Sequence, residues 1–292
     1  MKYTCLLSLF FILFACTQHK QNNRIISVSI EPLRYFTEQI GGTDFSIQVV
    51  VPPGASPETY EPTPSIMKTV SESASFISIG LLETELNIIN NLKTDENINL
   101  IELYKNVDLI EGNPHHHHGN LHKSDEHSAQ NGYDPHIWLS TKEALQISSV
   151  IRDELCRLNP DSCSKYQQNF NHLANEIKIL DKYIHQHLDS ADNRTFIIYH
   201  PALAYFCREY GFNQIAVESE GKEPSANSLK EIVSLARKEG IKTIFYQSQF
   251  SDATVKALAK EIAGTTEQLD PLAYNWLNNM YLITDLLSNK KE

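Results

Sequence analysis

The feature that most constrains the fold of this chain is a long apolar stripe near its middle. Apolar residues recur there at steps of three and four, namely Tyr166, Phe170, Leu173, Ile177, Leu180, Ile184 and Leu188. This spacing places them on one face of an α-helix. A continuous helix over residues 164–189 would be about 39 Å long at 1.5 Å per residue, which is the length of a small domain. We therefore predict a stiff linking helix within residues 161–190.

Short apolar runs alternate with amphipathic segments on both sides of this helix. The strands expected from these runs are residues 24–30, 45–51, 76–79, 99–104, 195–199, 214–217, 243–247 and 266–269. The helices expected between them are residues 32–40, 83–92, 142–158, 203–210, 228–238, 252–262 and 274–286. Such alternation is typical of α/β domains. We predict two lobes, residues 24–160 and 191–292, each with a mostly parallel sheet flanked by helices.

The N-terminus has the pattern of a bacterial lipoprotein signal. Lys2 precedes an apolar run over residues 6–13, which is too short to cross a bilayer as a helix, and the run ends in Leu-Phe-Ala before Cys16. We predict a signal peptide over residues 1–15, lipidation of Cys16 and a polar tether over residues 16–23. The alternative is an ordinary signal peptide in which the cysteine occurs by chance. Either interpretation predicts export, and the lipoprotein interpretation adds anchoring to a membrane.

Export to an oxidising compartment affects the redox state expected for the remaining cysteines. Cys156 and Cys163 flank an Asn-Pro turn, and an oxidising compartment permits a disulfide between them. Their spacing alone does not establish one. Cys207 falls in an apolar helical pattern and is expected in the core.

The charge balance excludes one class of partner. The formal net charge of the chain is −11, whereas a nucleic-acid surface needs clustered Lys and Arg. An acidic protein is compatible with cation binding, although acidic proteins are common. We expect no nucleic-acid partner and a monomeric protein.

Residues 113–131 lack apolar periodicity and are rich in histidine. The histidines of this segment are His115, His116, His117, His118, His122 and His127. Imidazole nitrogens are metal donors, and histidine-rich tracts bind metals by composition alone. Ordering such a loop costs conformational entropy, so its binding is expected to be weak. The alternative is a solvated insert without a function.

Four polar residues follow expected strands or lie in comparable loops. They are Glu58, His136, His200 and Asp270. Ligands of open α/β sheets bind beyond the carboxyl ends of the strands, and two imidazoles with two carboxylates can hold a divalent metal. Taken singly, each has a structural alternative, as a solvated charge, a helix cap, a hydrogen-bonded core histidine or a turn residue. Their joint pattern favours a metal site between the lobes.

Three motifs occur in order around these residues. They are PGASPETYEPTP at residues 53–64, DPHIWL at 134–139 and YHPALAYF at 199–206, and they are followed by ESEGKEPS at 218–225 and LDPL at 269–272. The set resembles the ZnuA-like zinc group of ABC-transporter substrate-binding proteins over nearly the whole mature chain. The resemblance implies a TroA-like fold, a buried metal in the cleft, and delivery to a membrane permease with its cytoplasmic ATPase. It implies no catalytic activity.

One position departs from the zinc group. Glu58 stands where these proteins usually have histidine, which moves the ligand set toward the oxygen-rich sites of manganese or iron relatives. His200 stands where manganese-type relatives typically have glutamate. Imidazole suits zinc, and oxygen ligands suit manganese. We predict Zn²⁺, with Mn²⁺ and Fe²⁺ as alternatives, and note that a water molecule replaces Asp270 in some zinc-type members.

The predicted function is high-affinity zinc binding on the periplasmic or outer face of a bacterial membrane, for import. The alternatives are a manganese or iron(II) carrier, a periplasmic zinc buffer or adhesin without a transport role, and a zinc hydrolase. The chain has no His-Glu-x-x-His motif, which disfavours the hydrolase. We expect the long helix to restrict lobe closure, and acid to weaken binding near pH ~6.5 or below as the histidines become protonated.

Overall fold

The structure is a computed structural model. It describes residues 25–93, 98–112, 132–191, 193–218, 223–250 and 252–288. The predicted signal peptide, Cys16 and the tether lie outside the described residues, and so do the histidines of segment 113–131.

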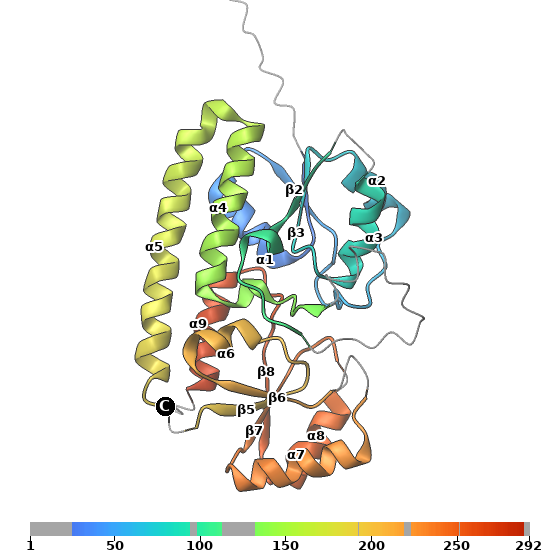
Figure 1. Ribbon diagram of the computed structural model, residues 1–292, viewed down its shortest axis with the longest axis vertical. Coiled ribbons are helices and arrows are strands. Elements are labelled where there is room, and N and C mark those ends of the chain that lie inside the picture. The colour runs from blue at the N-terminus through green and yellow to red at the C-terminus, as the bar shows by residue number, and fades with distance from the viewer. Residues whose placement is uncertain are drawn as a thin grey trace, which may run out of the picture.

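The N-terminal lobe contains a four-stranded parallel sheet with strand order β2-β1-β3-β4 (Figure 1). Its strands are β1 (Ile25–Val28), β2 (Ser46–Val49), β3 (Ser75–Ser78) and β4 (Asn99–Glu102), and its helices are α1 (Glu31–Gly41), α2 (Pro64–Ser71) and α3 (Glu83–Leu92). Almost every residue of β1 and β3 is buried, on both faces of the sheet, because helices cover it. Helix α2 was not predicted, although Thr63 caps its first turn and Pro64 opens it.

The C-terminal lobe repeats this arrangement with strand order β6-β5-β7-β8, again parallel throughout. Its strands are β5 (Thr195–Ile198), β6 (Asn213–Ala216), β7 (Thr243–Tyr246) and β8 (Thr265–Gln268), and its helices are α6 (Ala204–Tyr210), α7 (Ala226–Lys238) and α8 (Asp252–Glu261). The predicted fold class, two α/β lobes with largely parallel sheets, is confirmed.

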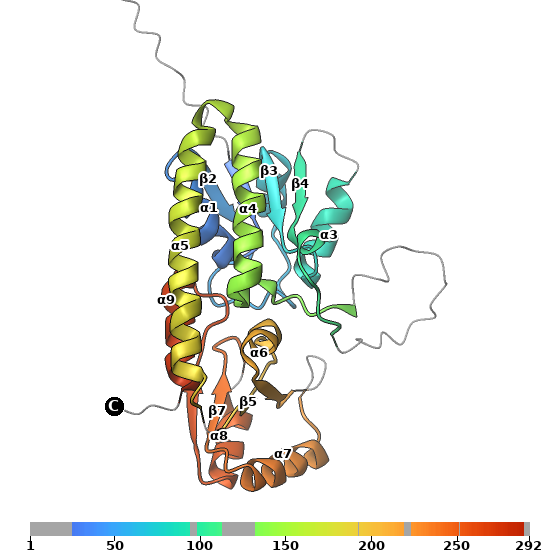
Figure 2. The same ribbon diagram turned by 60° about the vertical axis from the view of Figure 1, so that its left-hand side comes forward.

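Helix α5 (Cys163–Leu188) extends over 26 residues and runs beside both lobes (Figures 1 and 2). It packs against α4 (Thr141–Leu158) and against α9 (Trp276–Leu287), which returns from the C-terminal lobe. The apolar stripe is buried except at Phe170, which is half-buried beneath the guanidinium of Arg152. The larger apolar core continues from the N-terminal lobe through these helices to Phe206 and Trp276, so the lobes share packed side chains.

A disulfide joins Cys156, near the end of α4, to Cys163 at the start of α5, across the short 3₁₀ turn Pro160–Ser162. Cys207 is buried with a free thiol. Among the helices of the described residues, none has both the length and the apolar character that a bilayer crossing requires.

Candidate metal centre

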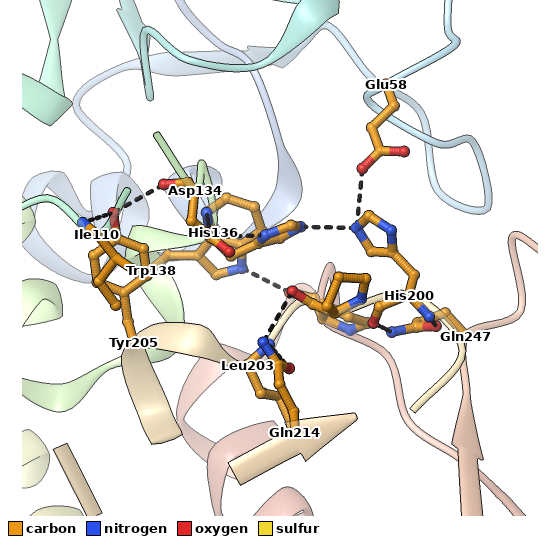
Figure 3. A network of polar contacts seen from close by, with 12 residues as sticks. Glu58, Ile110, Asp134, His136, Trp138, His200, Leu203, Tyr205, Gln214 and Gln247 are labelled. Atoms are coloured by element: carbon orange, nitrogen blue, oxygen red, sulfur yellow. Dashed lines mark hydrogen bonds and ion pairs between the residues drawn. The ribbon is translucent and has the colours of Figure 1, made fainter. Parts of the chain in front are cut away.

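Three of the four predicted ligands meet between the lobes (Figure 3). Glu58 lies in the loop that follows β2. His136 directly precedes the 3₁₀ turn Ile137–Leu139, and His200 follows β5. The strands β2 and β5 end at the carboxyl edges of the two parallel sheets, which face each other here. Residues that are 78 and 64 positions apart in sequence therefore share one small volume.

The ligand atoms of these three side chains all lie within 4.8 Å of one another. His200 Nε2 is 2.9 Å from Glu58 Oε1 and 3.2 Å from His136 Nε2. Two ligands of a tetrahedral zinc ion, each at about 2.0–2.1 Å, are about 3.3 Å apart. The separation of the two nitrogens is therefore already that of two corners of a zinc tetrahedron. The donor set of two imidazoles and one carboxylate fits a divalent cation.

The ring of His200 is held on both sides. Its Nδ1 lies 2.8 Å from Glu218 Oε1, and since a carboxylate only accepts, Nδ1–H is the donor. The side chain of Gln247 holds the backbone, because its amide donates to the His200 carbonyl at 2.8 Å and its carbonyl accepts from the His200 N–H at 3.2 Å. These contacts direct Nε2 into the cluster, as expected for a metal-binding histidine with a carboxylate behind it.

His136 is oriented in the same way by Asp134. The Asp134 carboxylate accepts from the backbone N–H of His136 at 2.9 Å and lies 3.0 Å from its Nδ1. With Nδ1–H donating to this carboxylate, Nε2 is left with a lone pair that points at the cluster. Both histidines are buried, so the two carboxylates also compensate for their lost hydration.

The surroundings of His200 change its acidity. Burial lowers the pKa of an imidazole, but hydrogen bonds to the carboxylates of Glu218 and Glu58 outweigh that effect and raise the pKa of His200 to about 9. Without a metal ion, the ring is therefore protonated at neutral pH and donates to Glu58. This differs from the pH ~6.5 expected from the sequence, because a sequence pattern does not place two carboxylates against one ring. A cation that binds here replaces a proton.

Aromatic rings enclose the cluster. The ring of Phe250 stacks on His200 at a centroid distance of 5.3 Å, and the indole of Trp138 lies 5.3 Å from His136. The cavity beside the ligand atoms has a volume of about 30 Å³. One water molecule needs at least about 10–15 Å³ of such space. The site therefore has room for one ion or water, and its apolar walls strengthen the attraction between a cation and its ligands.

Asp270 does not belong to this three-residue group within the described part of the chain. Its carboxylate accepts from the backbone N–H of Leu272 at 2.9 Å, and it lines a larger neighbouring cavity of about 330 Å³. Leu272 and Gln249 line both cavities. Asp270 as a fourth ligand therefore stays a prediction.

The residues on the two sides of segment 113–131 are paired with each other. Glu111 and Tyr133 form an antiparallel bridge, the Gly112 N–H donates to the Gly132 carbonyl, and the Asp134 N–H donates to the Ile110 carbonyl. The residues on both sides of the segment therefore lie next to Asp134, the partner of His136. Metal binding by its histidines stays a prediction.

Two residues that hydrogen-bond to His200, Glu218 and Gln247, were not predicted as site residues. Glu218 was noted only within a motif, although its place just after β6, at the carboxyl edge of the sheet, is a usable signal. Gln247 directly follows β7, at the same edge. A glutamine at a strand end has many other uses, so nothing in the sequence distinguished this one.

The chain is similar to known proteins over most of its length. The family model for ZnuA, described as zinc-uptake complex component A, periplasmic, matches residues 26–289. The chain belongs to the ZnuA family. The resemblance predicted from the sequence motifs is thereby confirmed. A crystal structure of ZnuA is 33% identical, with a TM-score of 0.82, and covers 92% of this chain and 99% of that chain.

Other ZnuA-family relatives match over similar lengths. A structure of a zinc-bound ZnuA deletion mutant is 34% identical, with a TM-score of 0.81, and covers 92% of this chain and 98% of that chain. The zinc-binding protein AdcA of Streptococcus pyogenes is 28% identical over 287 residues, which are 93% of this chain and 56% of AdcA. The high-affinity zinc uptake system protein ZnuA of Bacillus subtilis is 28% identical over 82% of this chain and 76% of that protein. The chain thus spans about half the length of its streptococcal relatives.

Proposed function

We propose that this protein binds one zinc ion outside the cytoplasm and delivers it to the membrane permease of an ABC importer. The observation that carries the proposal is the meeting of Glu58, His136 and His200, whose ligand atoms lie within 4.8 Å of one another, with the two imidazole nitrogens separated by 3.2 Å, close to the edge of a zinc tetrahedron. A lipid anchor at Cys16 and an ATPase on the cytoplasmic side of the permease belong to the same proposal. Asp270 or a water molecule completes the four ligands.

The donor set supports zinc over manganese. Two of the three converging donors are imidazole nitrogens, which suit zinc, whereas manganese and magnesium prefer sites made of oxygen. Glu58 supplies one negative charge, which offsets half the charge of the ion. The names of the relatives, zinc-binding protein AdcA and high-affinity zinc uptake protein ZnuA, support the same choice.

The shape of the site supports carriage rather than catalysis. A zinc hydrolase keeps an open position for water and room for the substrate beside it. The cavity next to the three ligand atoms has a volume of only about 30 Å³. A single ion fits in that volume, and the residues that line it besides the three ligands include no carboxylate or imidazole that could act as a general base.

Calorimetry with zinc tests the ligand assignment. The purified mature protein should bind one zinc ion tightly in the cleft, and His200→Ala should weaken that binding at least 100-fold, because it removes a donor and leaves Glu218 without its partner. His172→Ala is the matched control, since this histidine is exposed on α5. Equal affinity of the His200→Ala and His172→Ala variants would refute the assignment.

A growth experiment tests the transport role. Deletion of the gene should impair growth in zinc-depleted medium, and expression of the normal protein, but not of His200→Ala, should restore it. A deletion strain that grows normally under zinc limitation, in the absence of another zinc importer, would favour a zinc buffer over a transport protein.

A further inference from the structure

The loop that carries His136 is held by the C-terminal lobe. Tyr205 lies on α6, five residues after His200, and is completely buried. Its hydroxyl donates to the backbone carbonyl of Asp134 at 2.8 Å and accepts from the Ile110 N–H at 3.2 Å (Figure 3). Asp134 in turn holds the backbone and the ring of His136. A short chain of hydrogen bonds therefore runs from α6 to the second histidine.

Two further bonds hold the residues after His136. The indole N–H of Trp138 donates to the carbonyl of Pro271 at 2.7 Å, and the indole N–H of Trp276 donates to the carbonyl of Trp138 at 2.6 Å. Both partners lie in the C-terminal part of the chain. The His136 loop precedes α4 in sequence, and the Asp134 N–H bonds it to Ile110. The hydrogen bonds that Tyr205, Trp138 and Trp276 make through their side chains join the same loop to the structure that carries His200.

Glu58 is held differently. The Thr84 hydroxyl donates to the carbonyls of Pro57 and Tyr60, and the Thr84 N–H donates to Pro57, so the loop is fastened to the start of α3 in the N-terminal lobe. The Glu58 side chain is 31% exposed, against 12% for His200. Among the three converging ligands, Glu58 is the one carried by the N-terminal lobe alone.

We propose that Tyr205 is a positioning residue that joins the His136 loop to the segment bearing His200, so that the two histidines form a preassembled pair. Glu58 is then the ligand that approaches or leaves when zinc is exchanged. The inference rests on the proposed function. A movement between the lobes separates Glu58 from the histidines and keeps the two Nε2 atoms together.

This arrangement has a consequence for selectivity. Tyr205 holds the two nitrogens at a separation that suits tetrahedral zinc. Manganese prefers oxygen ligands and a higher coordination number, and gains less from this fixed pair. Removal of the hydroxyl should therefore weaken zinc binding more than manganese binding.

Tyr210 provides a matched control on the same helix. It is also buried, and its hydroxyl also bonds across to other helices, at 2.7 Å to the Thr141 hydroxyl and 2.8 Å to the carboxylate of Asp181. Tyr210→Phe thus removes an equivalent buried hydroxyl without touching the His136 loop. Any general loss of stability should appear in both variants.

The experiment compares the mature wild-type protein with Tyr205→Phe and Tyr210→Phe. Zinc and manganese affinities are measured by competition with a chelator, unfolding is measured without metal, and Co²⁺ serves as a spectroscopic probe of ligand geometry. Tyr205→Phe should weaken zinc binding about 10-fold, an effect typical of residues that support ligands, with a smaller loss for manganese and a changed Co²⁺ absorption spectrum. Tyr210→Phe should keep the wild-type spectrum and zinc affinity.

Two outcomes would overturn the inference. One is a Tyr205→Phe protein with the zinc affinity and Co²⁺ spectrum of Tyr210→Phe. The other is an equal loss of zinc affinity in both variants, which would reflect general destabilisation. Failure of the proposed function is distinguishable from both, because the wild-type protein itself would then bind zinc no more tightly than manganese.

Discussion

The two lobes have the same strand order but hold their metal ligands with different firmness. In the C-terminal lobe, His200 follows β5, the second strand in the sheet order, and both its ring and its backbone are bound by neighbouring side chains. In the N-terminal lobe, Glu58 is in a loop after β2, the edge strand, and its carboxylate is partly exposed. A position beside the central strands is surrounded by other strand ends, whereas an edge position is not.

This difference between His200 and Glu58 explains how one fold can combine a precise metal site with reversible binding. The buried histidines and their carboxylate partners fix the geometry that favours zinc. A ligand on a partly exposed loop costs little to displace, because water solvates the carboxylate once it leaves the ion. The predictions below test this division between the lobes, from the largest expected effect to the smallest.

The first prediction concerns the stability of the metal-free protein. The pKa of His200 is about 9 in the folded state, against about 6.5 for an unfolded chain, so its protonation stabilises the fold. That stabilisation is fully present below about pH 6.5 and is lost as the pH rises through 9. It amounts to about 3 kcal/mol, because one pKa unit corresponds to about 1.4 kcal/mol.

Urea unfolding of the metal-free protein between pH 6 and 10 measures this effect. His200→Gln should remove most of the decline between pH 6.5 and 9. If the free energy of unfolding declined equally in the wild-type protein and in His200→Gln, groups other than His200 would cause the pH dependence.

The second prediction concerns proton release. Zinc binds the deprotonated imidazole, so below pH 9 each ion displaces one proton from His200. The apparent zinc affinity should rise about 10-fold per pH unit well below pH 9, and about 50-fold in total between pH 7 and 9, because half of the His200 rings are already deprotonated at the pKa. Chelator-buffered zinc titrations give this slope, and calorimetry in buffers of different ionisation enthalpy counts the protons. An affinity that is level from pH 7 to 9 would contradict the pKa assigned to His200.

The third prediction concerns the ligand from the other lobe. Glu58→Gln keeps an oxygen donor but removes the charge, and should weaken zinc binding about 10-fold, chiefly through faster dissociation, since charged contacts are about twice as strong as neutral ones. Glu61→Gln, an exposed change in the same loop, is the control. Stopped-flow release of zinc to a chelator measures the rates. Unchanged dissociation in Glu58→Gln would mean that Glu58 does not limit zinc exchange.

The fourth prediction has the smallest expected effect. Replacement of residues 113–131 by a short Gly-Ser link should change the zinc affinity of the cleft less than about two-fold, because the ends of the segment remain paired by the Gly112 and Asp134 hydrogen bonds. Calorimetry of this variant should show that only weak zinc-binding events are lost. A large loss of cleft affinity would show that the segment contributes to the main site.

Much of the fold could be predicted from the sequence because it depends on local periodicity. The stripe from Tyr166 to Leu188 specified α5, and the alternation of strands and helices specified two parallel α/β lobes. Strand ends were less predictable, since residues 103–106 form a 3₁₀ turn rather than the end of a strand. Beyond Glu102, the Tyr104 N–H still donates to the Ile79 carbonyl, a contact between distant residues that local periodicity does not reveal.

The candidate ligands were predictable in kind but not in arrangement. His136 and His200 stand in motifs at the ends of expected elements, so their residue types and positions were sufficient to select them. Asp270 was selected by the same reasoning; its Oδ1 accepts from the Leu272 N–H, and its role as a fourth ligand stays a prediction. Whether a carboxylate turns toward an ion or toward a nearby backbone donor depends on packing, which a strand-end rule does not describe.

By itself, the sequence determined the α/β class, the long helix and the chemistry of the donors, because these follow from periodicity and from residue type. Only the tertiary structure decided that Glu218 and Glu58 would share one histidine ring, and that Tyr205 would reach the loop of the other. These contacts join residues from different strands and helices. Their distances, and the raised pKa of His200 that results, are set by how the two lobes pack together.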